Sequence, residues 1–172
     1  MASGVNEEKV CVPPVVRGVT DADRDWQREF LTEHFASPTI SSRRKWIDTM
    51  GLPGFVAWRG NERVGIALHT VMRAGAECEL VALASAGSGG GVGSALLASV
   101  TESARAAGCS RLVLTTTNDN LDAMRLYQRR GWRMVKIYPG AMDEARREMP
   151  AMPLVGAYGI AMRDDVEFEL VL

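Results

Sequence analysis

The distribution of hydrophobic and polar residues along the 172-residue chain predicts alternating strands and helices. Short apolar or alternating runs bounded by glycine, proline or asparagine are typical of β-strands, and apolar residues three or four positions apart are typical of helices. The strands are expected over residues 15–19, 55–59, 64–71, 77–84, 111–117, 132–137 and 166–172. The helices are expected over residues 21–35, 91–107, 118–131 and 143–148. This order indicates a mixed sheet with helices packed on its faces, in the α/β or α+β class.

Local signals mark the ends of several predicted helices. Thr20 and Asp23 form a capping box before the first helix. Gly108 and Gly131 are suited to end the second and third helices, since glycine readily takes the left-handed conformation that follows a helix. Residues 37–54 have no clear period and are expected to be irregular or briefly helical.

The composition changes the picture by excluding several classes of protein. Hydrophobic residues make up 47% and charged residues 24% of the chain, as in soluble globular proteins. We expect residues 1–14 to be a flexible tail and residues 15–172 to form a single domain. The net charge of −1 gives the protein no overall positive field that would attract nucleic acid. No apolar run approaches the roughly twenty residues of a membrane span, and no secretory signal is present, so we expect no membrane partner. Cys11, Cys78 and Cys109 fit neither a disulfide framework nor a metal site, which favours a cytoplasmic protein without a metal.

The segment ASAGSGGGVGSALL, residues 84–97, concentrates glycine between a predicted strand and a predicted helix. One interpretation is a flexible linker, but linkers separate independent units and are usually longer and more polar. The other is an anion cradle, because backbone N–H groups at a helix N-terminus and the helix dipole both attract phosphate. The segment has no lysine for a Walker loop. Gly91 and Gly93 are not followed by the third glycine of a dinucleotide-binding turn.

Two motifs in this part of the chain resemble a known family. SGGGVGSALL, residues 88–97, is similar to the Gln/Arg-x-x-Gly-x-Gly/Ala signature of the GNAT superfamily of N-acetyltransferases. NDNLDAMRLYQRRGW, residues 118–132, resembles the second signature of that family. The pair is specific because the two motifs occur in this order with one strand between them. Ser88 departs from the pattern, since the family usually has a long polar side chain there that can contact a pyrophosphate.

The resemblance implies a fold and a cosubstrate. It implies a mostly antiparallel mixed sheet whose middle strands, 77–84 and 111–117, splay apart, with helices on both faces. The pantetheine arm of acetyl-CoA would enter the gap and pair with the exposed strand edge, and the pyrophosphate would meet backbone N–H groups of the glycine run. The residues implied to bind acetyl-CoA are Val81, Leu83, Ser88, Gly89, Gly90, Gly91, Val92, Gly93, Ser94 and Asn120.

The resemblance also implies direct transfer of an acetyl group to a primary amine of a small molecule or peptide. Tyr127 matches the acid of the family, and a phenol with a pKa near 10 can protonate a thiolate whose conjugate thiol titrates near 8.5. The other interpretation of Tyr127 is a core residue packed against the sheet. Glu77 and Glu79 lie two apart on one strand and are candidate bases, acting directly or through water. They are equally interpretable as charges that protect a solvated strand, with water alone removing the amine proton.

Other residues allow more than one interpretation. His34 suits the end of its helix, and His69 is expected to be a core or sheet-face histidine. Three further features could either bind a ligand or serve the fold. The arginines of one helix could reach the phosphates of the cofactor or form a solvated face, and they are Arg125, Arg129 and Arg130. The basic stretch Ser42, Arg43, Arg44 and Lys45 could face a carboxylate on the acceptor or be an exposed loop, and Trp26, Trp46 and Trp58 could line the acceptor pocket or pack in the core. Residues 35–52 and 138–160 are expected to shape the acceptor pocket.

Two functions other than acetyl transfer also fit the sequence. One is transfer of another short acyl group from its CoA thioester. The other is an acyl-CoA-binding sensor or partner module without turnover, which Ser88 favours and the retained Tyr127 opposes. Association into a homodimer is left open.

Overall fold

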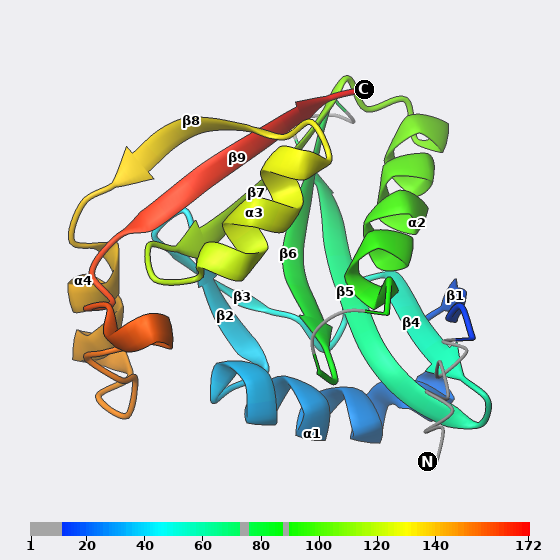
Figure 1. Ribbon diagram of the computed structural model, residues 1–172, viewed down its shortest axis with the longest axis horizontal. Helices are drawn as coiled ribbons and strands as arrows, with labels where there is room; N and C mark the ends of the chain where they lie inside the picture. The colour runs from blue at the N-terminus through cyan, green and yellow to red at the C-terminus, as the bar shows by residue number, and fades with distance from the viewer. Residues whose placement is uncertain (1–11, 73–75, 88–89) are drawn as a thin grey trace, which may run out of the picture.

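The protein is built around a mixed sheet, as its hydrophobic pattern predicts (Figure 1). The computed structural model describes residues 12–72, 76–87 and 90–172, so the predicted tail falls mostly outside the described residues. Within them the sheet has seven strands, which in spatial order are β1 (Val15–Gly18), β4 (Gly54–Arg59), β5 (Glu62–Met72), β6 (Glu77–Ser85), β7 (Arg111–Thr117), β9 (Asp165–Val171) and β8 (Arg133–Tyr138). All neighbouring strands are antiparallel except β6 and β7.

The helices occupy both faces of this sheet. They are α1 (Arg24–Phe35), α2 (Val92–Ala106), α3 (Leu121–Arg129) and α4 (Ala141–Glu148), with short 3₁₀ turns at Asp21–Asp23 and Ala157–Gly159. Successive residues of β4 face opposite sides, so Val56 joins the cluster beneath α1 and Ala57 joins the cluster beneath α2. Phe30 and Leu31 anchor α1, and α2 contributes Leu96 among others. The predicted layers are therefore present.

The middle of the sheet opens where β6 and β7 meet. The two strands are paired only between Glu77–Glu79 and Arg111–Val113, although both continue for several residues beyond. Figure 1 shows them diverging from the top of the view, with α3 beside the opening. The edge of β6 beyond Glu79 that faces β7 therefore has no β7 partner. The predicted splay of the middle strands is confirmed.

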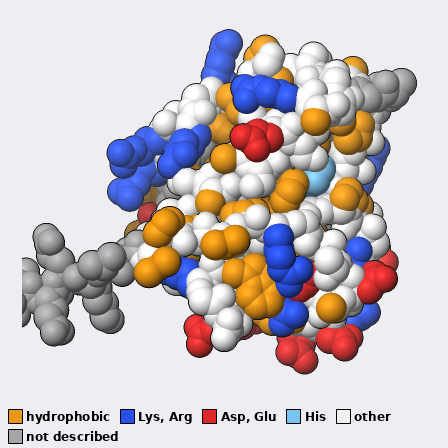
Figure 2. Space-filling model, turned by 90° about the vertical axis from the view of Figure 1, so that its right-hand side faces the viewer, with side chains coloured by type: hydrophobic (Ala, Val, Ile, Leu, Met, Phe, Trp, Pro, Cys, Tyr) orange, Lys and Arg blue, Asp and Glu red, His pale blue; other side chains and the backbone are white. Residues whose placement is uncertain are grey.

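Most predicted boundaries agree closely with the structure. Thr20 and Asp23 form the capping box, and Gly108 and Gly131 follow α2 and α3 with φ of 77° and 84°. Among the described residues no helix is long and apolar enough to cross a membrane. The side of the molecule that carries α2 and β1 mixes hydrophobic, basic and acidic side chains (Figure 2).

The prediction for residues 37–54 was wrong, because they contain a β-hairpin. β2 (Thr39–Ser42) and β3 (Lys45–Asp48) pair antiparallel across a two-residue turn. Arg43 and Arg44 form this turn with φ of 52° and 61°. Such a turn needs left-handed backbone at both central positions, where glycine or asparagine is the usual signal. A pair of arginines gives no such signal, so the hairpin is hidden in the sequence.

Buried ion pairs hold the hairpin on the sheet. Arg43 Nη1 lies 2.7 Å from Glu77 Oε1 on β6, and its Nε lies 3.2 Å from Glu167 Oε2 on β9. The hydroxyl of Ser42 donates to Glu79 Oε1 at 2.6 Å. Left-handed backbone at a non-glycine residue costs about 1–3 kcal/mol. The contacts of Arg43 offset that cost and fix the hairpin across β6, β7 and β9.

We expect the two arginines of the turn to differ strongly in their effect on stability. Arg43→Ala should lower the free energy of unfolding by about 3 kcal/mol, because it removes a cation from two buried carboxylates. Arg44→Ala should cost at most about 1 kcal/mol, because its 3.1 Å pair with Glu144 is exposed. Both positions have similar backbone strain, so the pair is matched. Urea unfolding measures the difference, and equal losses would show that the Arg43 ion pairs do not hold the hairpin.

Candidate functional site

Two cavities lie next to each other at the opening of the sheet. The larger, about 790 Å³, is named the arginine cavity after Arg125, Arg129 and Arg130, which line it. The smaller, about 550 Å³, is named the methionine cavity after Met142, Met149, Met152 and Met162. The residues that line both cavities are His34, Phe35, Leu83, Asn120 and Tyr127. These shared residues connect the two spaces.

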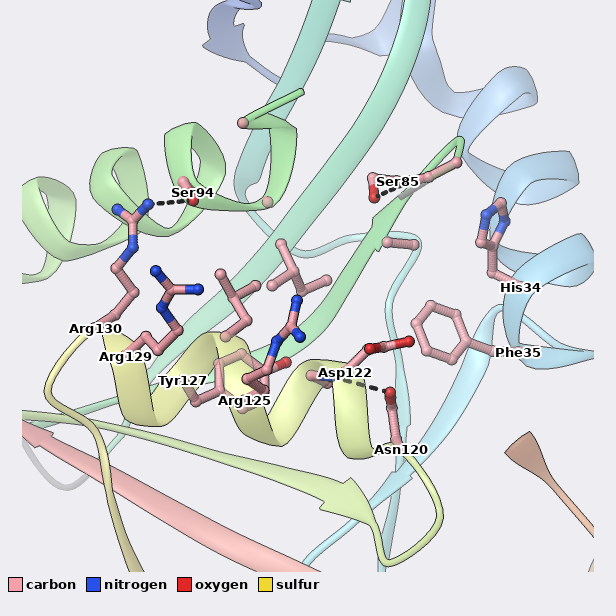
Figure 3. Close-up of a pocket in the computed structure, with 17 residues that line it drawn as sticks. His34, Phe35, Ser85, Ser94, Asn120, Asp122, Arg125, Tyr127, Arg129 and Arg130 are labelled. Carbon is pink, nitrogen blue, oxygen red and sulfur yellow. Dashed lines mark hydrogen bonds between the residues drawn. The ribbon is translucent and has the colours of Figure 1, made fainter. Parts of the chain in front are cut away.

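The arginine cavity combines a helix N-terminus with arginine side chains. Gly91, Gly93 and Ser94 at the start of α2 form one side, and the arginines of α3 extend toward it from the other (Figure 3). Arg130 Nη2 donates to Ser94 Oγ at 2.5 Å. Helix N-terminal N–H groups carry partial positive charge. The cavity is therefore suited to an anion such as a pyrophosphate.

The glycines of this turn serve different purposes. Gly91 is the N-cap of α2 with φ of 78°, and nothing lies within 4 Å of where its Cβ would be. Gly93 has no positive φ, and a Cβ there would lie 3.2 Å from Leu126 Cδ2, so glycine allows α2 and α3 to approach. Gly90 has φ of 64°, and a Cβ there would overlap the guanidinium of Arg59.

Arg59 is a residue that the sequence analysis missed. It lies at the end of β4 and its Nη2 donates to Gly90 O at 2.6 Å. This bond ties the glycine turn to the edge of the β4–β5 hairpin. The two residues are far apart in the chain, and Arg59 belongs to no motif, so only the structure brings them together.

The structure brings many of the implied binding residues together. Leu83 and Ser85 of β6 line the arginine cavity, and Leu80, Val81 and Leu83 line the methionine cavity, so the edge of β6 without a β7 partner runs past both. Asn120 is the N-cap of α3, accepts from the N–H of Ala123 at 3.3 Å, and lines both cavities.

Four implied residues are placed differently, or not at all. Gly90 lines neither cavity, and its carbonyl accepts from Arg59. The side chain of Val92 is buried in the core and lines neither cavity, so only its backbone is available to a ligand. Ser88 and Gly89 lie outside the described residues.

Tyr127 is both a core residue and a residue of the site. Its ring packs against Phe168 and Trp132 with centroid distances of 5.5 and 5.9 Å, and it is 6% exposed. It also lines both cavities. Burial raises the pKa of the phenol, so Tyr127 stays protonated at neutral pH. The two interpretations made from sequence are therefore compatible.

Glu77 and Glu79 share one face of β6 but are not solvated, being 1% and 2% exposed. The interpretation as charges on a solvated edge was therefore wrong. Burial raises the pKa of Glu77, but Arg43 and Arg111, at 2.7 and 2.5 Å, outweigh it and lower the pKa overall. Neither glutamate lines the arginine cavity or the methionine cavity. Glu77 is consequently a weak proton acceptor.

A hydrogen-bonded path does connect Glu79 with the methionine cavity. The hydroxyl of Ser42 donates to Glu79 and lies 2.9 Å from the hydroxyl of Thr115. Thr115 lines the cavity. Two hydroxyl groups in a chain can pass a proton from the cavity to the buried carboxylate.

The methionine cavity is bounded by the two segments expected to shape an acceptor pocket. Ile40 and Trp46 of the β2–β3 hairpin line it, opposite the methionines of α4 and the loop that follows. Trp26 and Trp58 lie elsewhere, each close to the guanidinium of Arg63. Arg43 and Arg44 form ion pairs within the protein and line neither cavity.

Two aspartates in the methionine cavity carry buried oxygens without a hydrogen-bond partner among the described residues. Asp165 Oδ2 is one, on a residue 2% exposed. Burial and the charge of Asp164 raise the pKa of Asp165 to about 7. Asp119 Oδ1 is the other, on a residue 4% exposed, whereas its Oδ2 accepts from the N–H of Ala157 at 2.8 Å.

The remaining candidates have structural contacts. His34 Nδ1 lies 2.8 Å from the carbonyl oxygen of Phe30, in the last turn of α1, as its predicted position implied. His69 is buried, stacks on Phe55, and has a pKa that burial lowers. In the ranges 12–72, 76–87 and 90–172, no three His, Cys, Asp or Glu side chains are grouped to hold a metal ion.

Comparisons with known proteins agree on one family. The model of the acetyltransferase (GNAT) family matches residues 20–132. The uncharacterized protein YdhI of Bacillus subtilis (strain 168) is 35% identical over 145 residues, which are 84% of this chain and 89% of that protein. The solved IAA acetyltransferase of Bacillus cereus ATCC 14579 has a TM-score of 0.74 at 22% identity, over 92% of this chain and 99% of that one. A GNAT family acetyltransferase of Elizabethkingia anophelis, solved with acetyl-CoA bound, has a TM-score of 0.65 at 19% identity, over 92% and 98% of the chains.

We expect Asp165→Asn to stabilise the protein in a pH-dependent way. The pKa of about 7 in the folded protein exceeds the 3.8 of a solvated aspartate, so the stability contributed by protonated Asp165 is complete below pH 3.8 and is lost as pH rises from there through 7. The asparagine side chain of the Asp165→Asn variant does not titrate and so has no such loss. The free energy of unfolding of the variant should therefore exceed that of the parent protein most at pH 8, and the difference should be about 2 kcal/mol smaller at pH 5.

Urea unfolding at both pH values measures this change. Glu148→Gln, an exposed carboxylate on α4 that lines neither cavity, is the control and should show no such trend. An advantage of Asp165→Asn that is equal at both pH values would mean that the carboxylate is solvated.

Proposed function

Because the chain belongs to the acetyltransferase (GNAT) family, we propose that it transfers an acetyl group from acetyl-CoA directly to the primary amine of a small molecule or peptide. The observation that carries this proposal is the junction of two cavities along the edge of β6 that lacks a β7 partner, with Tyr127 lining both. A donor and an acceptor bound on the two sides would meet beside a protonated phenol.

We assign acetyl-CoA to the arginine cavity. The backbone N–H groups of Gly91, Val92, Gly93 and Ser94 would bind its pyrophosphate at the positive end of α2. Arg125, Arg129 and Arg130 supply cationic side chains from α3, and in this way compensate for the short Ser88 of the signature. The bound acetyl-CoA of the relative from Elizabethkingia anophelis supports the choice of ligand.

The edge of β6 beside Val81 and Leu83 would bind the pantetheine arm. A strand edge offers alternating N–H and C=O groups, and an extended amide-containing chain can pair with them as an added strand. The same edge passes both cavities, so it would lead the reactive end of the arm from the arginine cavity toward the methionine cavity. Asn120 lines both spaces and would contact the ligand near that end.

Tyr127 is our candidate for the acid. Acetyl-CoA supplies a thioester carbonyl that a neutral amine attacks, with the C–S bond breaking after the N–C bond forms. The sulfur then needs a proton, and a phenol whose pKa is raised by burial keeps one available. For the proton released by the amine, the path through Thr115 and Ser42 favours Glu79 over Glu77, whose carboxylate is committed to two arginines.

We expect CoA to stabilise the protein and the substitution Gly91→Val to remove this effect. CoA at a hundred times its dissociation constant should add about 2.7 kcal/mol to the free energy of unfolding. Valine at position 91 would project into the phosphate site and is disfavoured at a φ of 78°. Gly140→Val is the matched control, because Gly140 also caps a helix with φ of 71° but lines neither cavity.

Both variants should lose intrinsic stability, and only Gly91→Val should lose the response to CoA in a thermal-shift titration. If the parent protein does not respond to millimolar CoA, the assignment of the cosubstrate is wrong.

We also expect Tyr127→Phe to separate binding from chemistry. It removes one oxygen from a ring that packs on Phe168, so the fold and the CoA affinity should be nearly unchanged. Turnover should fall about 10²-fold, as for the loss of a positioned acid. Tyr158→Phe is the control, since Tyr158 is exposed and lines neither cavity. Thiol release from acetyl-CoA with an accepted amine measures both, and parental turnover of Tyr127→Phe would assign the tyrosine to packing alone.

A further inference from the structure

The two cavities have opposite electrostatic character. Three arginines line the arginine cavity, whereas the methionine cavity has no lysine or arginine among the described residues that line it. Its ionisable side chains include the carboxylates of Asp119 and Asp165. A cavity whose lining carries charge of one sign repels ligands of that sign and attracts ligands of the opposite sign. The space next to the proposed donor site is therefore suited to a cation.

The nearby arginines have partners within the protein. Arg146 donates to the carbonyl oxygens of Pro153 and Met162 beside the cavity and pairs with Asp143. The stretch Ser42–Lys45 could have presented positive charge to a carboxylate on the acceptor, but Arg43 is bound between Glu77 and Glu167. Arg44 pairs with Glu144 of α4. Arg43, Arg44 and Lys45 do not line the methionine cavity, so this stretch places no cationic side chain in it.

The two aspartates need a partner that the described residues do not provide. Asp165 Oδ2 and Asp119 Oδ1 are buried without a hydrogen bond among those residues. Burying a carboxylate is costly unless it is paired and hydrogen-bonded. An ammonium group has three N–H donors and a positive charge, so it suits a cavity that these two aspartates line. Asp119 directly precedes Asn120, which lines both cavities, so an ammonium there lies close to the donor side.

One part of the cavity wall is apolar, and the cavity is of small-molecule size. Four methionines line it with Ile40, Trp46, Leu80 and Leu114. Methionine is flexible and polarizable, and it packs against varied apolar shapes. The volume of about 550 Å³ is within the range for small-molecule sites, roughly 300–1,000 Å³. Hydroxyl groups of Thr39, Ser41 and the threonines 115–117 also line the cavity, so an apolar body would pack on the methionine part of the wall.

We propose that the acceptor is a compact hydrophobic primary amine without an acidic group, and that Asp119 and Asp165 bind its ammonium form in the methionine cavity. This inference rests on the proposed acetyl transfer and names the acceptor class for it. The bound ammonium gives one proton to Glu79 along the path through Thr115 and Ser42, and the neutral amine then attacks the thioester carbonyl. Asp119 and Asp165 determine specificity in two ways: they attract the ammonium group and repel a carboxylate next to it. An amino acid should therefore be a worse acceptor than the amine that lacks only its carboxylate.

The test compares 2-phenylethylamine with phenylalanine, which differ by that carboxylate, and with glucosamine, which is an amine without an apolar body. It is made at pH 8, where Asp165 with its pKa of about 7 is mostly ionised. We expect kcat/KM for 2-phenylethylamine to exceed the value for either of the others at least about tenfold, because a carboxylate would meet like charge and a sugar has no apolar body to pack on the methionines. Asp119→Asn and Asp165→Asn should each raise KM for 2-phenylethylamine about tenfold, as for the loss of a charged hydrogen bond. Glu148→Gln removes an exposed carboxylate outside both cavities and should leave KM unchanged.

The selectivity ratio distinguishes recognition from a structural role. Removing either carboxylate should raise kcat/KM for phenylalanine relative to kcat/KM for 2-phenylethylamine. A general loss of packing would not change this ratio. Preference for phenylalanine or glucosamine, or a ratio unchanged in both aspartate variants, would overturn the inference while leaving acetyl transfer intact.

Calorimetry keeps the inference testable if no amine is acetylated. Binding of 2-phenylethylamine to the CoA-saturated protein, weakened in both aspartate variants, supports the inference even where the proposed turnover fails. Absence of binding of 2-phenylethylamine with and without CoA would overturn it. A failure to bind CoA contradicts the proposed function instead, and amine binding to the free protein then decides the inference separately.

Discussion

The short parallel pairing of β6 and β7 is the constraint on which the site depends. Three residues of each strand are joined, and beyond Glu79 and Val113 the strands diverge. If β7 paired with β6 along its whole length, the backbone groups of β6 would be bonded on both edges, and no ligand could bind to the edge that faces β7. Because β5 and β9 continue to pair with β6 and β7, the sheet stays intact while its centre opens. Both cavities follow from this one divergence.

The opening would be a solvent-exposed groove without the β2–β3 hairpin. Arg43 fixes the hairpin by joining β6 to β9 through Glu77 and Glu167, across the strand that lies between them. The hairpin thus supplies one wall of the methionine cavity, and α4 with its following loop supplies another. The charges of this network are paired within the protein, whereas Asp119 and Asp165 line the methionine cavity and each has a buried oxygen without a hydrogen-bond partner among the described residues. The carboxylates that hold the hairpin are therefore different from those proposed to bind the acceptor.

Much of this arrangement was predictable because it is encoded locally. Alternating apolar residues gave the strands, and the glycine turn with the capped helix at Asn120 gave the family, which the comparisons confirm. The hairpin at Arg43 and Arg44 was missed because side chains from distant strands, rather than turn residues, hold its backbone. Arg59 and Asp165 were missed for the same reason. Their importance depends on what faces them, and neither residue stands in a motif.

The contact between Arg59 and Gly90 couples the glycine turn to the β4–β5 hairpin. The guanidinium occupies the volume that a side chain at position 90 would need, and the backbone there is left-handed. A side chain at position 90 would push the flexible end of Arg59 aside, and the carbonyl of Gly90 would lose its donor. Substitution of this one glycine would therefore strain the turn and also detach it from the neighbouring hairpin.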